Sequence, residues 1–329
     1  NAAAEDLAFI ARQTEPDSLM YYDNHNRLDD SCTLHSELGS LYVSRKMFMQ
    51  AVDVLLKGGN WVDAAYIAER VLTPEELQNY VDTTWPASML VPVNEEDGFG
   101  PEGRKAAAIR YLLARRLTRL GQYENARSYY PNTQKELLKN FDTFTDALKR
   151  GNDKSLSKRE RTDAYWTAAR LMRRSGMELI GTELSPDWHM YAGNYSLTDT
   201  FQGRIAVLES NKLNIPTQEE IDRAQENISV FPDKRWHYRY FASELAWESA
   251  SLMNNEDPEL ARRLCVAGTW HKAKDPEYAD VFYKSLVLRC GTTALGKEAD
   301  RIRWFPKIPD TLEPGEPYVP PQEVSDAVQ

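Results

Sequence analysis

The sequence predicts an all-α protein: a superhelical array of antiparallel helical hairpins, with two long irregular loops and an extended Pro-rich C-terminal tail. Three observations support this prediction. Apolar residues make up 42% of the 329 residues, a share typical of folded chains and too high for a disordered one. This length is long for one compact core, whereas stacked repeats bury their apolar faces only against their neighbours. Finally, one pattern of apolar and small residues at helical spacing recurs along the first half of the chain.

The clearest copy of this pattern runs from His35 to Gly58 and contains, in order, Leu38, Gly39, Tyr42, Phe48, Ala51 and Leu55. Leu38 and Tyr42 are four residues apart and therefore share one face of a helix. Gly39 lies between them and allows a second helix to approach closely. After a turn at residues 44–47, the large and small residues recur at helical spacing on that second helix. We therefore expect helices near residues 31–45 and 47–57.

Two partial copies of the pattern follow. Residues 59–64 read Gly-Asn-Trp-Val-Asp-Ala, and residues 121–126 read Gly-Gln-Tyr-Glu-Asn-Ala. The later copy is followed by Tyr129 and Tyr130, and the helix before it supplies Leu113, Ala114 and Leu117 at the corresponding positions. Both copies predict a turn followed by a helix.

The order Leu-Gly-x-x-Tyr, a gap, and then aromatic-x-x-Ala-x-x-x-Leu resembles the tetratricopeptide repeat. The resemblance implies a TPR-like α-solenoid, and proteins of this type often hold peptides in a concave groove. The chain departs from the pattern at Lys46, where the turn of the repeat usually has Gly. It departs again at Pro131, which interrupts the second helix of the last copy. Such a pattern indicates a fold and not a function.

Further helices are predicted from their first residues. Residues 73–76 read Thr-Pro-Glu-Glu, and both 257–259 and 275–277 read Asp-Pro-Glu. A capping side chain, then Pro, then acidic residues are typical of a helix N-terminus, and Thr217 opens a similar segment. We expect the remaining helices near residues 3–13, 60–72, 74–83, 102–120, 122–130, 133–149, 157–175, 217–228, 235–253, 258–270, 276–290 and 293–303.

These elements divide the chain into six regions. They are N-terminal hairpins at 1–83, an irregular loop at 84–103, a basic helical region at 104–180, an irregular aromatic loop at 181–216, C-terminal hairpins at 217–305 and the Pro-rich tail at 306–329. Irregular segments longer than about 12–15 residues are often functional. The tail cannot continue a helix because its prolines lack the N–H donor, so we expect it to be extended, either packed on the last hairpin or disordered.

Charge is unevenly distributed along the chain. The net charge is −10, which argues against a general nucleic-acid binder. Residues 104–174 nevertheless carry 18 Lys+Arg against 7 Asp+Glu, a local net charge of +11. A basic middle between acidic ends predicts one of three arrangements: it binds an acidic partner, packs against the ends of its own chain, or pairs with a second copy. The alternative is a solvated helix face.

The first candidate site is the basic face of this middle region. Its residues are Arg104, Lys105, Arg115, Arg116, Arg119, Arg170, Arg173 and Arg174. Arg115 and Arg119 are four apart, as are Arg170 and Arg174, so each pair shares a helix face. Guanidinium groups bind carboxylates bidentately, which suits an acidic protein segment. The alternative is a set of structural salt bridges within the chain, to Glu124, Glu136 and Asp163.

The second candidate site is the aromatic loop at residues 181–195. It combines Glu183, Asp187, Trp188, His189, Tyr191, Asn194 and Tyr195. Aromatic rings beside carboxylates and amides suit sugars or peptides, and two carboxylates could in principle act on a glycosidic bond. The alternative is a plug that uses its aromatic residues as core.

No motif predicts catalysis, a cofactor or a metal. Residues 98–103 match GxGxxG without the strand that a dinucleotide site needs, and residues 291–297 match only the spacing of a P-loop before Glu298. The cluster Asp23, His25, Asp29, Asp30, Cys32 and His35 contains possible metal ligands but lacks a second close ligand pair, so helix capping and core packing explain it as well. The three cysteines form no CxxC pair.

We therefore expect a non-catalytic binding or scaffold protein whose concave, partly basic surface holds an acidic protein segment. One alternative is a glycan- or peptide-binding envelope protein, possibly glycan-processing, that uses the aromatic loop. Another is a structural subunit whose acidic and basic parts pair from copy to copy. No transmembrane segment is expected, because no run of about 18 apolar residues occurs. The composition fits a bacterial cell envelope and fits a cytoplasm nearly as well. The chain opens without Met, so we expect a processed or truncated piece.

Overall fold

The computed structural model describes residues 30–94, 98–184, 187, 206, 209–210, 215–227 and 237–308. Within these ranges, nothing is described for the side chains of residues 30–33, 93–94 and 98. The helix expected near residues 3–13, most of the aromatic loop and most of the tail lie outside the described residues.

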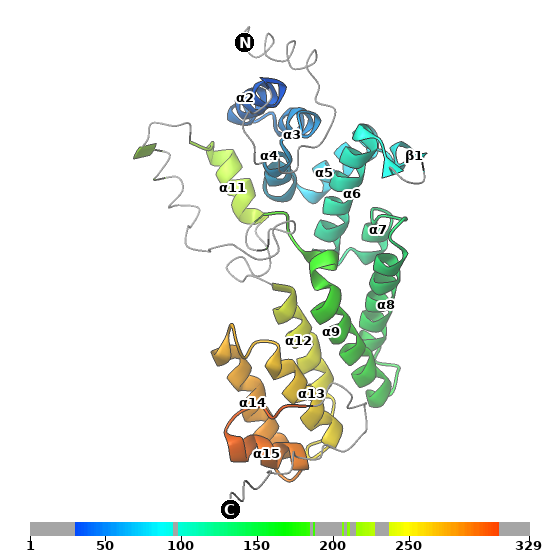
Figure 1. The fold of residues 1–329 in the computed structure, drawn as a ribbon, viewed down its shortest axis with the longest axis vertical. Coiled ribbons are helices and arrows are strands. Elements are labelled where there is room, and N and C mark those ends of the chain that lie inside the picture. The colour runs from blue at the N-terminus through cyan, green and yellow to red at the C-terminus, as the bar shows by residue number, and fades with distance from the viewer. Residues whose placement is uncertain are drawn as a thin grey trace, which may run out of the picture. The chain divides into compact units, whose positions relative to one another are not determined.

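The described part of the chain is helical, apart from one small sheet (Figure 1). Its helices before the aromatic loop are α2 (Asp30–Ser44), α3 (Phe48–Lys57), α4 (Trp61–Tyr66), α5 (Pro74–Thr84), α6 (Pro101–Arg119), α7 (Tyr123–Arg127), α8 (Lys135–Asn152) and α9 (Lys158–Ile180). The later helices are α11 (Gln218–Glu226), α12 (His237–Ser251), α13 (Pro258–Thr269), α14 (Pro276–Cys290) and α15 (Ala294–Ile302). The all-α prediction is confirmed for this part, and the helix positions agree closely with those expected.

Local capping explains several helix starts. Thr73 accepts a hydrogen bond from the backbone N–H of Glu76, and the Glu76 side chain accepts one from the Thr73 N–H, which together form a capping box. Thr217 and Asp257 also cap their helices through the side chain. These are the residues whose sequence context predicted the starts, because capping depends only on neighbours along the chain.

The irregular loop expected at 84–103 contains short regular elements. A single 3₁₀ turn, η2 (Ala87–Met89), precedes the antiparallel pair β1 (Pro92–Asn94) and β2 (Gly98–Phe99). Pro101 then occupies the first turn of α6. A two-stranded ribbon this short carries no periodic sequence signal, and for that reason the sequence did not predict it.

Three turns of the chain share one backbone geometry. Lys46, Gly59 and Gly121 all have positive φ, at 61°, 78° and 74°. In each turn the next residue donates its N–H five residues back: Met47 to Tyr42, Asn60 to Leu55 and Gln122 to Leu117, all at 2.9 Å. These are the 6→1 bonds of a Schellman C-cap. An aromatic residue then opens the next helix at Phe48, Trp61 and Tyr123.

Small residues face the helix contacts that follow these turns. Ala51, Ala64 and Ala126 lie three residues after the aromatic residue, and each is 0% exposed. Gly39 on α2 faces α3, where an added Cβ would lie 2.5 Å from Leu55 Cδ2. The close approach of α2 and α3 therefore depends on the missing side chain at this position, as the sequence pattern predicted.

Two helices end or change earlier than expected. The helix expected at 60–72 becomes the π turn η1 (Ile67–Val71) after Tyr66, with a bond from Leu72 N–H to Ile67 O. The helix expected at 122–130 ends at Arg127, because Pro131 cannot donate to the carbonyl one turn earlier and disfavours helical backbone at Tyr130.

The chain forms two compact units, each discontinuous in sequence. Unit 1 comprises residues 1–138 and 177–237, and unit 2 comprises residues 139–176 and 238–329. In unit 1, α2 packs on α3 and α6 packs on α5 and α7. In unit 2, α13 packs on α14 and α15, and its core includes edge-to-face pairs such as Phe144–Phe241 and Trp247–Phe282.

Candidate functional site

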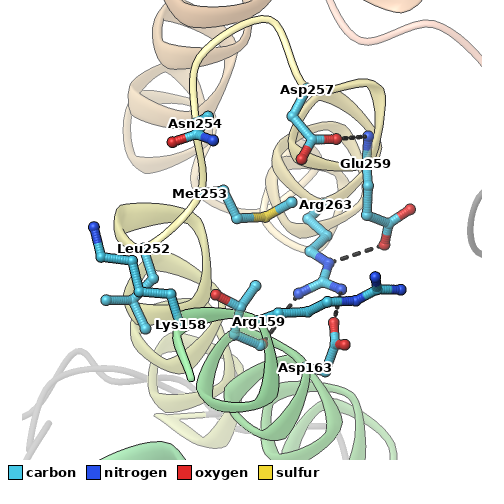
Figure 2. A pocket seen from close by; sticks show the side chains of 10 residues that line it. Lys158, Arg159, Asp163, Leu252, Met253, Asn254, Asp257, Glu259 and Arg263 are labelled. Atoms are coloured by element: carbon cyan, nitrogen blue, oxygen red, sulfur yellow. Dashed lines mark hydrogen bonds and ion pairs between the residues drawn. The ribbon is translucent and has the colours of Figure 1, made fainter. Parts of the chain in front are cut away.

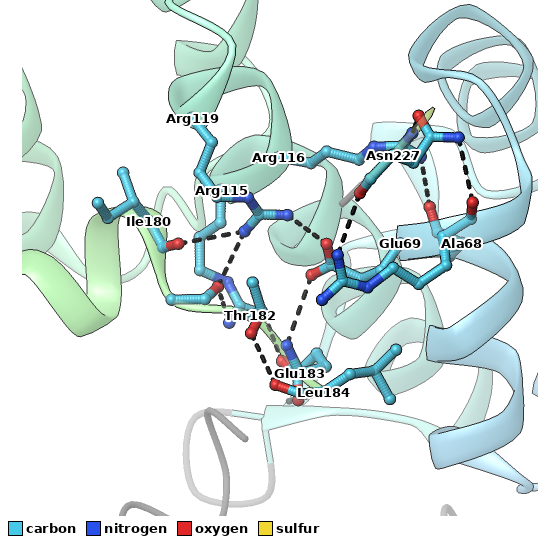
Figure 3. A network of polar contacts seen from close by, with 12 residues as sticks. Ala68, Glu69, Arg115, Arg116, Arg119, Ile180, Thr182, Glu183, Leu184 and Asn227 are labelled. Atoms are coloured by element: carbon cyan, nitrogen blue, oxygen red, sulfur yellow. Dashed lines mark hydrogen bonds and ion pairs between the residues drawn. The ribbon is translucent and has the colours of Figure 1, made fainter. Parts of the chain in front are cut away.

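A buried polar network in unit 1 contains three arginines of the predicted basic face (Figure 3). Arg115 on α6 is 0% exposed and forms an ion pair with the buried carboxylate of Glu183. It also donates to the carbonyl oxygen of Gly181 at 3.0 Å, and its guanidinium lies 4.5 Å from the Tyr111 ring centroid. Glu183 accepts a further bond from Trp61 Nε1 at 3.2 Å. The charge of Arg115 is therefore fully engaged inside the chain.

Arg116 and Arg119 are engaged in the same network (Figure 3). Arg116 donates to the carbonyl oxygens of Ala68 and Leu72, at 2.5 and 2.7 Å, and to the side chain of Asn227 at 2.7 Å. Arg119 pairs with Glu69, which lies in the π turn η1 and is 3% exposed. Since a π turn changes the backbone bonding pattern of this segment, its carbonyl groups become acceptors for a side chain from α6.

This network changes the interpretation of the predicted basic face. Arg115 and Arg116 are buried, and Arg119 is largely buried, with carboxylates and carbonyls of unit 1 as partners. Lys105 is also buried, donating to the last carbonyl of α3 at Lys57 and to Glu102. Arg104 remains exposed and donates to Phe99 O at 2.8 Å. Among the described residues, Arg115 pairs with Glu183 and Arg119 pairs with Glu69, two carboxylates that the sequence did not suggest as partners of these arginines.

Two candidate site residues of the aromatic loop, Glu183 and Asp187, are described, and both are buried. Glu183 is 7% exposed and Asp187 is 0% exposed. Asp187 accepts a bond from Thr182 N–H at 3.3 Å and pairs with buried His237. Both carboxylates therefore hold this part of the loop to the core of unit 1. Trp188, His189, Tyr191 and Tyr195 lie outside the described residues.

In unit 2, a groove runs along the contact between α9 and α13. The contact pairs Asp163 with Arg263, in the middle of α13, and Trp166 with Trp270, directly after the end of α13. The order of these contacts shows that the two helices run in the same direction. Two depressions lie along this contact, and we call them together the α9/α13 groove. Both are surface depressions lined by residues of unit 2.

The first depression has a volume of about 530 Å³ and is shown in Figure 2. Its walls come from the start of α9, the segment after α12 and the start of α13, with Lys158, Arg159, Asp163, Met253, Asp257 and Arg263 among the lining residues. Lys158 and Arg159 are exposed. In the described part of the chain no carboxylate forms an ion pair with either of them. This volume lies within the usual range of ligand sites.

The acidic groups of the first depression are already engaged. Arg263 donates to Glu259 at 2.9 Å, to Asp163 at 2.5 Å, to Thr162 O at 3.0 Å and to Ser249 Oγ at 2.9 Å. Burial alone raises the pKa of Glu259, but hydrogen bonds and charges from Arg262 and Arg263 outweigh it, and the pKa lies below its usual value. Asp257 accepts the N–H of Glu259 as the cap of α13. The unengaged charges here are therefore cationic.

The second depression, of about 390 Å³, lies farther along both helices. Its apolar floor includes Leu171, Val266 and the Trp166–Trp270 pair, whose rings stack at 6.0 Å between centroids and 13° between planes. Arg170, Arg173 and Arg174 also line it. Arg170 and Arg174 are exposed and line this depression from one face of α9. These three are the residues of the predicted basic face that the structure brings together in one depression.

Arg173 is held at an unfavourable electrostatic position. Burial lowers the pKa of its guanidinium, and the nearby positive charge of Arg239 lowers it further. Its Nε atom is buried with no hydrogen-bond partner in the residues that the structure describes. A desolvated cation beside a second cation is stabilised by an anion placed against it. The groove is therefore suited to a negatively charged ligand.

Several groove residues could not have been selected from the sequence. Trp166 lies about 100 residues before Arg263 and Trp270 along the chain, and nothing local connects it to them. The sequence signal that was available is the i, i+4 spacing of basic residues on α9, which identified Arg170 and Arg174. The same helix carries Lys158 and Arg159 at its start, and these were not selected.

The described residues of the weaker motifs have structural roles, whereas Asp23, His25 and Asp29 lie outside the described residues. His35 is 2% exposed and packs where a Cβ on Gly58 would clash with it, at 2.2 Å. Gly291 is the C-cap of α14 and Thr293 caps α15, so residues 291–297 are a short helix-to-helix turn followed by the first turn of α15. Gly103 lies in the first turn of α6 against Phe99. Within the described ranges, no group of three or more His, Cys, Asp or Glu side chains could hold a metal ion.

A scan against protein-family models, a search of curated proteins and a search of solved structures each found no match for this chain. None of the helices in the described ranges has the length and hydropathy that a membrane span requires. The function must therefore be argued from the geometry of the two units.

Proposed function

We propose that this chain is a non-catalytic binding protein of TPR-like architecture, which holds an acidic segment of a partner protein in the α9/α13 groove. The observation that carries the proposal is the set of basic side chains along this groove. Lys158, Arg159, Arg170, Arg173 and Arg174 line it, and none of them forms an ion pair with a carboxylate in the described part of the chain.

The repeated turns support a TPR-like architecture. Three helix-to-helix connections share the same C-cap, the same hydrogen bonds and the same aromatic-x-x-Ala start. A unit of this kind buries its apolar face against the next hairpin. Grooves between stacked helices are surfaces on which such an array would hold an extended partner.

The chemistry of the groove supports a protein segment over a small metabolite. Guanidinium groups form two parallel hydrogen bonds to a carboxylate, and several are spread along α9 instead of converging on one point. Apolar area at Val266 and Trp270 offers contact for side chains between the acidic groups. Exposed ion pairs contribute about 0.2–1 kcal/mol each, so we expect moderate affinity that depends on several contacts together.

The test is a charge reversal of the groove, Arg170→Glu with Arg174→Glu. The probe is a fluorescein-labelled peptide of Glu, Ser and Leu residues, and binding is followed by anisotropy. We expect the double variant to lose at least about tenfold in affinity, because two attractive pairs become repulsive. The matched control is Lys284→Glu with Lys297→Glu, two exposed lysines of unit 2 that do not line the groove.

The control changes the net charge by the same amount, so it separates a local effect from a global one. Far-UV circular dichroism should show the same helical signal in all three proteins. Equal affinity of the groove variant and the control would refute the proposal.

A further inference from the structure

We propose that the α9/α13 groove selects a bipartite acidic segment: two acidic clusters separated by about six uncharged residues in an extended conformation. This inference rests on the proposed function and adds the charge pattern and length of the ligand. It follows from where the cations lie along α9, and from what lies between them.

The cations form two groups at the two ends of the groove. Lys158 and Arg159 line the first depression, whereas Arg170, Arg173 and Arg174 line the second. Arg159 and Arg173 are fourteen residues apart on one helix, which corresponds to about 21 Å at about 1.5 Å per residue. An extended chain covers that distance in about six residues, at about 3.3–3.6 Å each.

Between the two groups the groove presents an exposed carboxylate. Asp163 lines the first depression, and its side chain is 55% exposed although it pairs with Arg263. Thr167, which is uncharged, follows it on the exposed face of α9 and lines the second depression. A carboxylate in the middle of a bound segment would face Asp163 and be repelled. The helix therefore presents positive, negative and again positive charge, and its complement is negative, neutral, negative.

The groove suits a ligand that lies along the contact between the two helices. The helices touch through Asp163–Arg263 and Trp166–Trp270, so a bound segment lies over this contact and not between the helices. The two depressions, of about 530 and 390 Å³, are large enough to receive side chains from a chain lying along the contact. Linking two weak anchors on one chain raises affinity only when the linker spans both sites.

The experiment compares labelled peptides of equal length against the full chain, by anisotropy. One peptide carries two Glu₃ clusters with a spacer of six Ser, Gly and Pro residues, one has the same clusters with a spacer of two, and one has a single cluster. We expect the six-residue spacer to bind at least about tenfold tighter than the single cluster, and the two-residue spacer to gain little. Proline in the spacer excludes a helical ligand.

Two protein variants test the two ends separately. Lys158→Glu with Arg159→Glu, and Arg170→Glu with Arg174→Glu, should each reduce binding of the six-residue-spacer peptide to the level of the single cluster. Lys284→Glu with Lys297→Glu serves as control. Equal affinity for spacers of two and six, or full affinity after reversal of Lys158 and Arg159, would overturn the bipartite inference while leaving the proposed function intact. Absence of binding by every acidic peptide would instead refute the proposed function itself.

A third comparison tests the neutral middle. A peptide with Glu in its spacer should bind more weakly than the neutral-spacer peptide, despite its larger negative charge. Asp163→Asn removes the central carboxylate and keeps an oxygen that can accept a hydrogen bond from Arg263. This variant should therefore show a smaller difference in affinity between the two peptides. Tighter binding of the all-acidic peptide by the unmodified protein would show that total charge, and not its pattern, determines recognition.

Discussion

The arginines of this chain differ in where their charge is balanced. Arg115 is 0% exposed and has a carboxylate within its own unit, whereas Arg170 is exposed and has no carboxylate partner among the described residues. A buried charge is tolerated only when it is paired and hydrogen-bonded, so Arg115 contributes to the fold. Arg170 is free to contribute to binding.

Removing one partner of the buried pair should be strongly destabilising. For Arg115→Met we expect the free energy of unfolding of unit 1 to fall by about 3–5 kcal/mol, because Glu183 is left as an unpaired buried charge. Urea unfolding, followed by circular dichroism, measures the change. Arg115→Met combined with Glu183→Leu should recover part of this loss. A loss under about 1 kcal/mol for the single variant, similar to that of exposed Arg104→Ala, would contradict the assigned role.

His271 should make unit 2 sensitive to acid. Burial lowers its pKa to about 4, and the charges of Arg239 and Arg173 act in the same direction. Its Nε2 lies 2.7 Å from Ser243 Oγ. Its ring centroid lies 4.6 Å from that of Tyr240 and 4.7 Å from that of Tyr278. In the unfolded chain an imidazole takes up a proton near pH 6.5, so the unfolded state binds more protons between these two values. Stability is therefore full above about pH 6.5 and is lost as the pH falls toward about 4, by at most about 1.4 kcal/mol per pH unit.

The measurement compares urea unfolding of the wild type and His271→Gln at several pH values. The carboxylates titrate in both proteins, so the difference between the two slopes isolates His271. We expect the variant to show the shallower dependence between pH 6.5 and 4. Parallel curves would show that His271 does not carry this proton linkage.

At the scale of elements, the three matching turns show how much of the fold is local. The sequence predicted the turns at Gly59 and Gly121, and the helix after each, from Gly, an aromatic residue and Ala at fixed spacing. It predicted the first turn from the aromatic residue and Ala alone, with Lys46 where the repeat usually has Gly. The structure gives Lys46 the same left-handed backbone as Gly59 and Gly121. Backbone geometry is therefore repeated even where the residue is not.

This difference between residues gives a matched pair of substitutions. Lys46→Gly should raise the free energy of unfolding by about 0.5–1 kcal/mol, because Gly adopts positive φ without the steric penalty of a Cβ. The exposed ion pair that this substitution removes, between Lys46 and Glu219 at 3.3 Å, contributes little to stability. Gly121→Ala should lower the free energy of unfolding by about 1 kcal/mol through backbone strain alone, since an added Cβ there meets no atom within 4 Å. Thermal unfolding measures both; changes of the same sign would contradict the argument.

Helix ends and local variants of the helix were less predictable than helix positions. The π turn η1 supplies Glu69 to Arg119 and the carbonyl of Ala68 to Arg116. Those contacts come from α6, far along the chain, so the periodicity of residues 60–72 could not indicate the change. The small sheet at β1 and β2 was missed for a similar reason, because two very short strands carry no pattern.

At the scale of the whole molecule, the sequence showed where positive charge is concentrated along the chain, but not which of these charges are buried. The chain has a net charge of −10, with +11 in residues 104–174. Part of that positive charge is buried in unit 1, and part lines the groove of unit 2. The acidic partner that we propose would be attracted by a local patch on a chain that repels it overall, and such attraction acts only over short distances in salt.

Salt should consequently weaken binding of an acidic peptide. Raising the ionic strength from 0.1 to 1 M shortens the Debye length from about 10 to about 3 Å, and we expect the affinity to fall by at least about fivefold. Anisotropy titrations at both salt concentrations measure it, with a neutral peptide as control. An affinity that is independent of salt would point to apolar recognition.

Salt dependence also tests the hypothesis that the chain is a structural subunit whose copies pair with each other. If copies of the chain pair through acidic and basic parts, light scattering should give a molecular mass that falls toward that of one chain, 37.7 kDa, as salt rises. A constant mass at every salt concentration would exclude such pairing and leave the groove to a different partner.

The sequence by itself determined where the helices lie, because helical periodicity and capping depend on residues within one or two turns of each other. It also located the small residues that let helices approach, at Gly39, Ala51 and Ala126. The tertiary structure decided which arginines are structural and which remain available. Arg115 meets Glu183 across 68 residues, Arg119 meets Glu69 across 50, and Arg263 meets Asp163 across 100. Electrostatic partners are set by distance in space, and desolvation by the packing of distant segments, so no local pattern contains either.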